Sequence, residues 1–233
     1  MNDASRLRAK TCSRIVARLR MPHHTTDALI LRTYQLGESD RIVVFLTRDR
    51  GKKRGVAKNA RQSRRRFGGA LEPMTYGRVG YVERERRELV SLRYVEPVRS
   101  PLSAVHGEAL GYVGYFAELI DEWAQDADPN ETLFRLGASM VDAMAAGVPI
   151  EPLARYFEYW LLRLQGVYQP DPRLSEEARA FLAAARGLSP FGLGSLPVSV
   201  HALREIEASH RTLIAMHLEK DLRSLRVLRE MRG

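Results

Sequence analysis

The sequence predicts an α+β protein of two domains, a five-stranded OB-type β-barrel followed by an all-helical domain. Short apolar runs bounded by turn residues recur over residues 25–99, as in a small all-β unit. After Pro97 and Pro101 the apolar residues change to the spacing of amphipathic helices. The 233 residues are 45% apolar and 28% charged, enough to bury a sizeable core. We therefore expect a barrel domain at 25–99 and a helical domain at 100–233, with a basic tail at 1–24.

The first domain is expected to contain five short strands. They are predicted at residues 28–31, 41–47, 52–58, 74–82 and 89–95. Gly77 and Gly80 in the fourth strand suggest bulges or barrel corners, because glycine brings no side chain to pack. A long arginine-rich loop at 59–69 separates the third strand from the fourth. Such an arrangement is typical of the OB barrel, whose curved sheet and exposed loops can bind oligonucleotides.

The second domain is expected to be entirely helical. Helices are predicted within residues 102–123, 133–144, 153–164, 175–186, 200–220 and 222–231, with a Pro/Gly/Ser-rich loop at 187–199. Asn130 is a candidate cap of the second helix. The longest stretch without charged residues is broken by prolines and glycines, so no membrane span is expected. The single cysteine, Cys12, excludes an intramolecular disulfide and fits a reducing cytosol.

The net charge is concentrated in residues 48–66, called here the basic stretch. It carries ten Lys/Arg and one acid, a net charge of +9, which equals the net charge of the whole chain. A localised basic segment is typical of a polyanion partner. Apolar runs at 42–46 and 67–71 bracket the stretch, which argues against a merely solvated or disordered segment. The expected DNA-binding residues are Arg41, Lys52, Lys53, Arg54, Lys58, Arg61, Arg64, Arg65 and Arg66.

Three further residues are secondary candidates for DNA contacts. Phe67 could stack on a base, and its alternative role is to fill the barrel interior. Arg223 and Arg226 recur on one side of the last helix, where the alternative is a solvated face or charges that suit a helix C-terminus.

An acidic cluster and two histidines raise the question of a metal site. The cluster comprises Glu118, Asp121, Glu122, Asp126, Asp128 and Glu131. Paired carboxylates could indicate a metal-dependent nuclease, but no Lys or His accompanies them in a catalytic spacing, so a solvated helix face is the preferred interpretation. His210 and His217 are two helical turns apart, about 10 Å, too far for one ion to bridge easily, and both are expected to be core or boundary residues on the apolar side of their helix. No metal, cofactor or catalytic site is expected.

Four short motifs follow one another around the basic stretch. They are Gly37–Arg41 (GESDR), Thr47–Lys52 (TRDRGK), Ala57–Arg61 (AKNAR) and Gly69–Pro73 (GALEP). In this order and spacing they resemble the RecO family of bacterial recombination mediators, which read GESDR, TxxxGK, AKGAR and GALEP. Asn59 stands where the family usually has glycine. The resemblance continues at Leu119–Asp121 and covers about residues 27–231.

Many members of that family carry a four-cysteine zinc module after the helix that ends here near Gly166. This chain passes from Tyr168 to Ser175 without a cysteine, so zinc binding is not expected.

The resemblance implies an ATP-independent protein that binds single- and double-stranded DNA and anneals complementary strands. The implied partners are RecR, often RecF, and the single-strand-binding protein, whose acidic-hydrophobic tail docks on the helical domain. RecA would be loaded onto the coated DNA. A cytoplasmic, nucleoid-associated location is implied as well. The competing interpretation is an RNA-binding OB-fold protein of the translation apparatus.

Overall fold

The computed structural model describes residues 23–63, 65–83 and 88–232, with the side chain of residue 232 excepted. Most of the predicted basic tail and the candidate Arg64 lie outside the described residues. His23 and His24, placed at the end of that tail by the sequence, already belong to the first strand.

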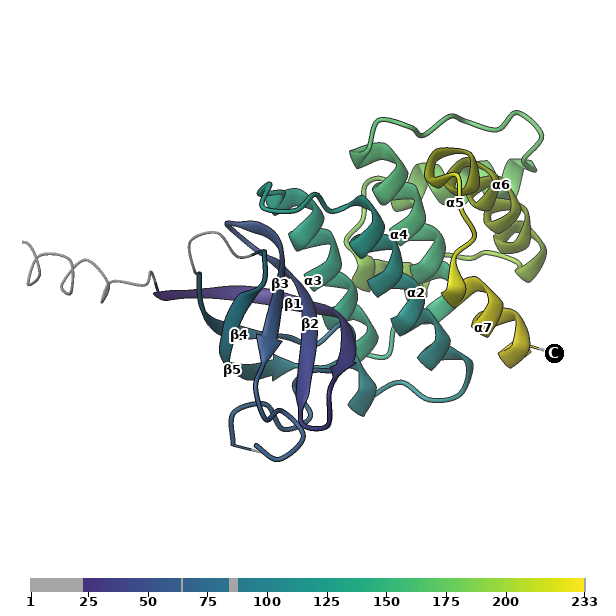
Figure 1. Ribbon diagram of the computed structural model, residues 1–233. Helices are drawn as coiled ribbons and strands as arrows, with labels where there is room; N and C mark the ends of the chain where they lie inside the picture. The colour runs from purple at the N-terminus through teal and green to yellow at the C-terminus, as the bar shows by residue number, and fades with distance from the viewer. Residues whose placement is uncertain (1–22, 64, 84–87, 233) are drawn as a thin grey trace, which may run out of the picture.

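Five strands close into a barrel, as predicted (Figure 1). The strands are β1 (His23–Leu36), β2 (Asp40–Thr47), β3 (Gly51–Ala57), β4 (Tyr76–Val82) and β5 (Val90–Arg99). Their order is β1-β2-β3-β5-β4, with β4 pairing back onto β1. The pairs are antiparallel except for β3 with β5. β1 is much longer than its predicted apolar run because its two halves pair with different strands, β4 first and then β2.

The barrel interior is filled by side chains from alternate positions along the strands, together with Phe67 and Ala70 of the β3–β4 loop. Register shifts in β4 occur next to Gly77 and Gly80, the predicted bulge positions. A side chain at Gly80 would collide with the ring of Tyr94, 2.2 Å from its Cβ position. The interior contains Ala28, Ile30, Val43, Phe45, Ala57, Phe67, Ala70, Val79, Tyr81, Val90, Leu92 and Val95.

The remaining chain is helical and lies to one side of the barrel (Figure 1). Its elements are η1 (Pro101–Ser103), α2 (Glu108–Trp123), α3 (Glu131–Ala145), α4 (Ile150–Leu164), α5 (Glu176–Ala185), η2 (Pro190–Ser195), α6 (Val200–Leu218) and α7 (Arg223–Arg232). Asn130 caps α3 through Leu133 N, as predicted, and Ser175 and Ser199 cap α5 and α6. The predicted loop at 187–199 contains a short 3-10 helix. No described helix is long and apolar enough to cross a membrane.

The barrel and the helices share one hydrophobic core. The outward faces of β1 and β2 contribute Leu29, Leu31, Val44 and Leu46 to the same buried cluster as α2 and α3. Gly137 of α3 allows this contact, since an added Cβ would lie 2.7 Å from Leu29 Cδ1. The helices therefore cover one side of the barrel and leave its other surfaces available.

Inside the helical domain, a polar network joins α2, α4 and α6. The buried carboxylate of Glu158 accepts a hydrogen bond from Tyr115 Oη at 2.8 Å and lies 3.0 Å from Arg155 and 3.1 Å from His210 Nδ1. His210 is thus a core residue, as predicted. His217 is not on the apolar side of α6, since it is exposed and stacks on Trp123.

Candidate nucleic-acid interface

The loop between β3 and β4 closes the end of the barrel that lies away from α3 and α4. Asn59 starts it with a left-handed backbone (φ 53°), a conformation that glycine and asparagine adopt most readily. Asn59 N donates to Asp40 Oδ1 at 2.8 Å, and Arg61 N donates to Ser39 O at 3.3 Å. The β1–β2 turn and this loop therefore form one surface, called here the loop end. The replacement of the family's usual glycine by Asn59 is explained by the same backbone requirement.

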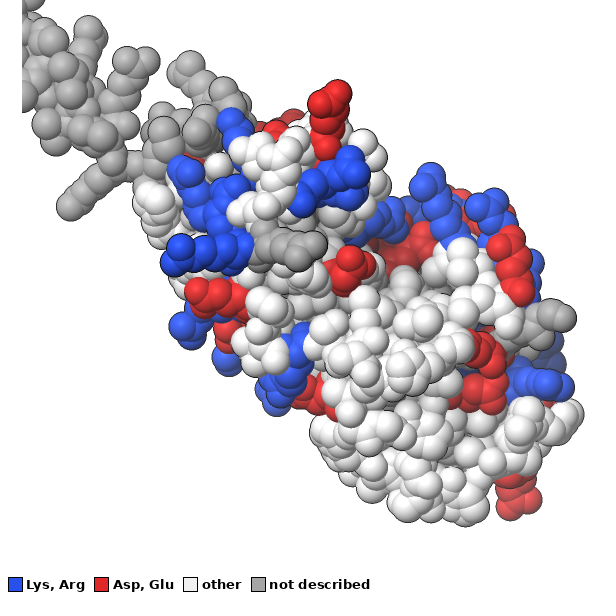
Figure 2. Space-filling view, turned by 90° about the horizontal axis from the view of Figure 1, so that it is seen from below, with Lys and Arg blue, Asp and Glu red and all other residues white. Residues whose placement is uncertain are grey.

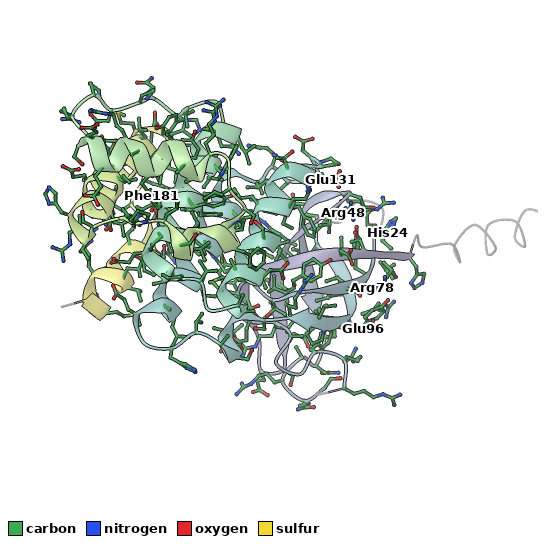
Figure 3. All side chains as sticks on the ribbon, turned by 180° about the vertical axis from the view of Figure 1, so that it is seen from behind. His24, Arg48, Arg78, Glu96, Glu131 and Phe181 are labelled. Atoms are coloured by element: carbon green, nitrogen blue, oxygen red, sulfur yellow. The ribbon has the colours of Figure 1, made fainter. Side chains whose placement is uncertain are left out.

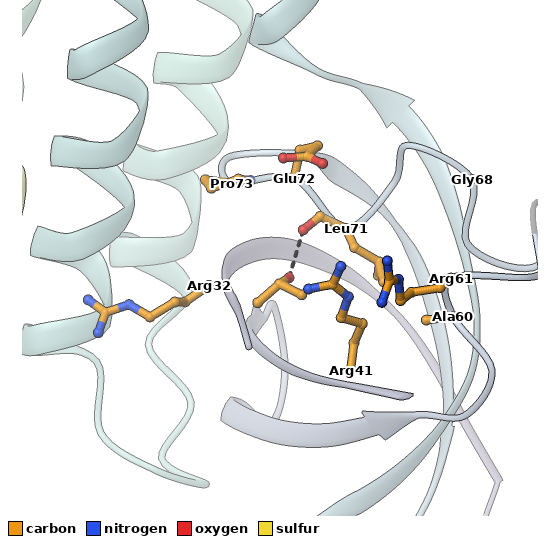
Figure 4. A pocket seen from close by; sticks show the side chains of 9 residues that line it. Arg32, Arg41, Ala60, Arg61, Gly68, Leu71, Glu72 and Pro73 are labelled. Atoms are coloured by element: carbon orange, nitrogen blue, oxygen red, sulfur yellow. Dashed lines mark hydrogen bonds between the residues drawn. The ribbon is translucent and has the colours of Figure 1, made fainter. Parts of the chain in front are cut away.

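An open hollow of about 610 Å³ lies in the loop end. Arg41 of β2 and Arg61 of the loop both line it, and Figure 4 draws their guanidinium groups next to each other, with Arg61 Nη1 also donating to Glu38 O at 3.2 Å. Thr33 Oγ1 donates to Leu71 O at 2.7 Å and ties the far wall to β1. Two guanidinium groups that converge in an open hollow suit a phosphate, which accepts hydrogen bonds from both. The lining residues are Arg32, Thr33, Arg41, Ala60, Arg61, Gly68, Leu71, Glu72 and Pro73.

The loop that forms part of the hollow carries further exposed cations. Lys58 and Arg65 are exposed on the same loop. Seen from below, the barrel carries most of the blue surface, with a few acids among it, while much of the helical domain is uncharged (Figure 2). Of the predicted residues, Arg41 and Arg61 thus line the hollow, and Lys58 and Arg65 are exposed on the loop that contributes Arg61.

Two neighbouring residues of the loop hold its structure. Arg66 donates from Nε to Ser63 Oγ at 2.9 Å and from Nη2 to Lys58 O at 2.7 Å, and its guanidinium group lies 5.0 Å from the centroid of the Phe67 ring. Phe67 is 1% exposed and belongs to the barrel interior. The prediction that Phe67 stacks on a base is wrong, since neither ring face is open. Its alternative role, to fill the barrel, is the one observed.

Lys52 lies in the seam between the two domains and not on the exposed sheet, which corrects the prediction for this residue. Its Nζ donates to Asp121 O at 2.6 Å and lies 3.3 Å from Asp121 Oδ1, and the residue is 8% exposed. Its main chain also bonds to the segment after α2, through Gln125 O and Ala127 N. Gly51 precedes it with φ 68°, and an added Cβ would lie 2.4 Å from Asp128 N. The Gly-Lys pair therefore docks β3 on the helices.

The other cations of the seam also face acids. Arg48 pairs with Glu131 at 2.7 Å, and Figure 3 shows the two side chains meeting across the domain boundary. This hydrogen bond and its charge raise the pKa of Arg48. Arg54 is exposed and lies 3.9 Å from Asp126. Arg99 of β5 similarly pairs with Asp142 of α3 at 2.8 Å.

The acidic cluster is only in part a solvated face: Asp126, Asp128 and Glu131 are exposed, whereas the three acids of α2 are not. Glu118 is 8% exposed, Asp121 faces both Lys52 and Arg32, and Glu122 pairs with Lys220. These carboxylates are counter-ions of the barrel and of the C-terminal segment. Among the described residues, no three His, Cys, Asp or Glu side chains are grouped so that they could hold a metal ion.

The structure also places Lys53, which is a predicted residue, and Arg32, which is not. Lys53 donates to Glu83 Oε1 at 2.9 Å, which lowers the pKa of that carboxyl. Arg32, which the sequence analysis did not select, lies at the edge of the hollow but turns toward the helices, 3.6 Å from Glu118 and from Asp121 (Figure 4). Its position directly after the apolar run of β1 gave no signal of this contact, since the partners lie on α2.

Residues 21–101 match the family model described as recombination protein O N terminal, and residues 106–172 match recombination protein O C terminal. The chain belongs to the RecO family. The GALEP and AKNAR motifs of this chain supply the wall and the loop of the hollow, through Leu71–Pro73 and Ala60–Arg61.

Curated RecO relatives are similar to this chain over more than half of its length. The DNA repair protein RecO of Koribacter versatilis (strain Ellin345) is 45% identical over 148 residues, 63% of this chain and 59% of the relative. That of Anaeromyxobacter sp. (strain K) is 40% identical over 168 residues, 71% of this chain and 65% of the relative. The chain thus matches about 60% of the length of these relatives.

Proposed function

We propose that this chain is an ATP-independent recombination mediator in DNA repair, which binds DNA and anneals complementary strands. The observation that carries the proposal is the loop end, where Arg41 and Arg61 converge in an open hollow beside exposed Lys58 and Arg65. Membership of the RecO family, whose curated relatives are named DNA repair proteins, supports the same conclusion.

The mechanism requires only phosphate contacts. Lysine and arginine neutralise phosphates and release counter-ions, so that affinity depends on salt and not on base sequence. Annealing brings two polyanions together, and a protein that screens both lowers their repulsion without hydrolysis of a nucleotide. In this proposal the loop end holds a strand by its backbone and leaves the bases free to pair.

The proposed partners are those that the resemblance to the RecO family implies. The chain would act with RecR, and with RecF where it is present, to help load RecA onto single strands coated by the single-strand-binding protein, in the cytoplasm at the nucleoid. For the acidic-hydrophobic tail of that protein, a hollow of about 270 Å³ beside α4 and α5 is the candidate site. Arg163, Arg179 and Arg186 surround Tyr159 and Tyr168 there, so a carboxylate and an apolar side chain would both find partners.

The test is annealing of two complementary oligonucleotides, one coated with the single-strand-binding protein, without ATP. The loop-end variant is Arg41→Gln/Arg61→Gln/Arg65→Gln. The matched seam variant, Arg48→Gln/Arg54→Gln/Arg99→Gln, removes the same charge from arginines of the barrel domain that already face acids. We expect fast annealing with the wild type and the seam variant and slow annealing with the loop-end variant.

Two results would contradict the proposal. No annealing together with tight binding to structured RNA would favour an RNA-binding protein of the translation apparatus. Cleavage of DNA in magnesium, lost on Asp121→Asn, would indicate a nuclease.

A further inference from the structure

The C-terminal helix α7 presents a row of arginines that the proposed function does not use. α7 lies beside α2 (Figure 1) and runs antiparallel to it, because Ser224 contacts Glu118 while Leu228 contacts Gly111. Gly111 has no side chain, and an added Cβ would lie 2.7 Å from Leu228 Cδ2. Leu228 is buried by this contact. The helix is thus held firmly by its apolar side, and its other side faces solvent.

Glu118 fixes the start of α7 and links it to the barrel. Its carboxylate accepts hydrogen bonds from Arg223 N at 3.2 Å, Ser224 N at 2.7 Å and Ser224 Oγ at 2.5 Å. The same carboxylate lies 3.6 Å from Arg32, whose side chain extends to it from the edge of the hollow in the loop end. The first turn of α7 therefore lies next to the barrel surface proposed to hold DNA.

Helix stability does not explain the arginines at this end. The helix dipole disfavours cations in the first turn by about 0.3–1 kcal/mol. Arg223 and Arg226 nevertheless stand there, and the first turn contains no acid of its own. Glu118 supplies the anionic cap from α2 instead. Within the described residues, the guanidinium groups of Arg223, Arg226 and Arg229 form no ion pair, and all three residues are exposed. Such a set of unpaired cations is suited to an external anion.

The spacing of these arginines fits a phosphate backbone. Three residues rise about 4.5 Å along a helix, so the row from Arg223 to Arg229 spans about 9 Å. A strand whose bases are stacked as in a duplex carries a phosphate about every 3.4 Å along its axis, so about three of its phosphates fit beside the row. An acidic peptide would also require an apolar hollow, and the hollow with that chemistry lies beside α4 and α5.

We infer that the exposed arginine face of α7 is a second DNA-binding track, which holds the second strand while the loop end holds the first. The inference rests on the proposed annealing function. It assigns the two strands to separate surfaces of one molecule, bridged by the Arg32–Glu118 pair.

The experiment uses two non-complementary oligonucleotides with different dyes, so that energy transfer reports both strands on one molecule. The α7 variant is Arg223→Gln/Arg226→Gln. Its matched control, Arg135→Gln/Arg204→Gln, removes two exposed arginines from α3 and α6. A charge-preserving variant, Arg223→Lys/Arg226→Lys, separates charge from helix structure.

We expect the α7 variant to bind the first strand within about twofold of the wild type and to lose energy transfer, while the control and the lysine variant keep it. The dependence of second-strand affinity on salt should fall by about 1.4 in its logarithmic slope, 0.7 for each of two phosphates. Unchanged energy transfer in the α7 variant would overturn the inference. So would a loss of binding to the acidic tail peptide with DNA binding intact.

The same titration separates this inference from the proposed function. One outcome is that the wild type binds one strand, the loop-end variant fails to bind it, and the α7 variant behaves like the wild type. In that case only the second DNA-binding track is refuted. If the wild type binds no strand at all, the proposed function itself fails.

Discussion

The ammonium group of Lys52 on β3 donates to the main-chain oxygen of Asp121 on α2, at 2.6 Å, and lies 3.3 Å from the Asp121 carboxylate. A residue of the basic stretch is thereby used to join the two domains. The stretch consequently has two parts, one whose cations face acids of the helical domain or, for Lys53, Glu83 of the barrel domain, and one, at the loop end, that faces solvent.

Replacement of Lys52 should affect stability and not DNA binding. Lys52→Met leaves the Asp121 carboxylate, 12% exposed, without its nearest cation, and the loss of one partner from a buried pair costs about 3–5 kcal/mol. We expect chemical denaturation to show a decrease of this size in the free energy of unfolding. The control is Lys58→Met at the loop end, which should change stability by less than about 0.5 kcal/mol. Equal stability of the two variants would contradict the role of Lys52 in joining the two domains.

Phe67 should behave as a core residue. Phe67→Ala removes a side chain that is 1% exposed and should lower the free energy of unfolding by about 3–5 kcal/mol. Phe67→Leu keeps most of the volume and should keep single-strand affinity, measured by fluorescence anisotropy with a labelled oligonucleotide. A leucine variant of normal stability with weakened DNA binding would show that the ring contacts bases after all.

The contact between α5 and α6 predicts a pH dependence of stability. Hydrogen bonds from Ser199 Oγ and Ser199 N lower the pKa of Glu177. A carboxyl whose folded-state pKa is lowered stabilises the protein above its unfolded pKa, about 4.3, and this contribution is lost as pH falls through the folded value. Glu177→Gln should therefore lower the melting temperature at pH 7 and have little effect near pH 3.

Glu176 provides the control for this pH dependence. Glu176 lies in the same first helical turn, so that both residues interact similarly with the helix dipole. Thermal unfolding of Glu176→Gln should differ from the wild type by a smaller and less pH-dependent amount. A Glu177→Gln variant that is equally destabilised at pH 7 and pH 3 would argue against the hydrogen bonds as the cause.

The fold could be predicted largely from local patterns. Each strand and helix is marked by apolar spacing and by turn or capping residues such as Asn130, which act within a few positions of the chain. Gly77 and Gly80 likewise marked the irregular positions of β4. The length of β1 was not predictable, because its first half is defined by pairing with β4 and carries polar residues.

The site was only partly predictable. The count of charges located the basic stretch, but a count cannot tell which cations have partners that are distant in sequence. Lys52 and Asp121 are 69 positions apart, and the acids of α2 keep helical phase as solvated acids also do. Phe67 follows a row of arginines, yet its burial depends on the barrel that closes over it. Only the tertiary contacts show that Arg41 and Arg61 line the open hollow while Lys52 is buried between the domains.

The salt dependence of single-strand affinity tests the central claim most directly. Each phosphate contact contributes about 0.7 to the slope of log affinity against log salt concentration. The loop-end variant, Arg41→Gln/Arg61→Gln/Arg65→Gln, should lower this slope by about 2, while the seam variant, Arg48→Gln/Arg54→Gln/Arg99→Gln, should leave it nearly unchanged. Equal slopes for the two variants would contradict the assignment of the DNA-binding surface to the loop end.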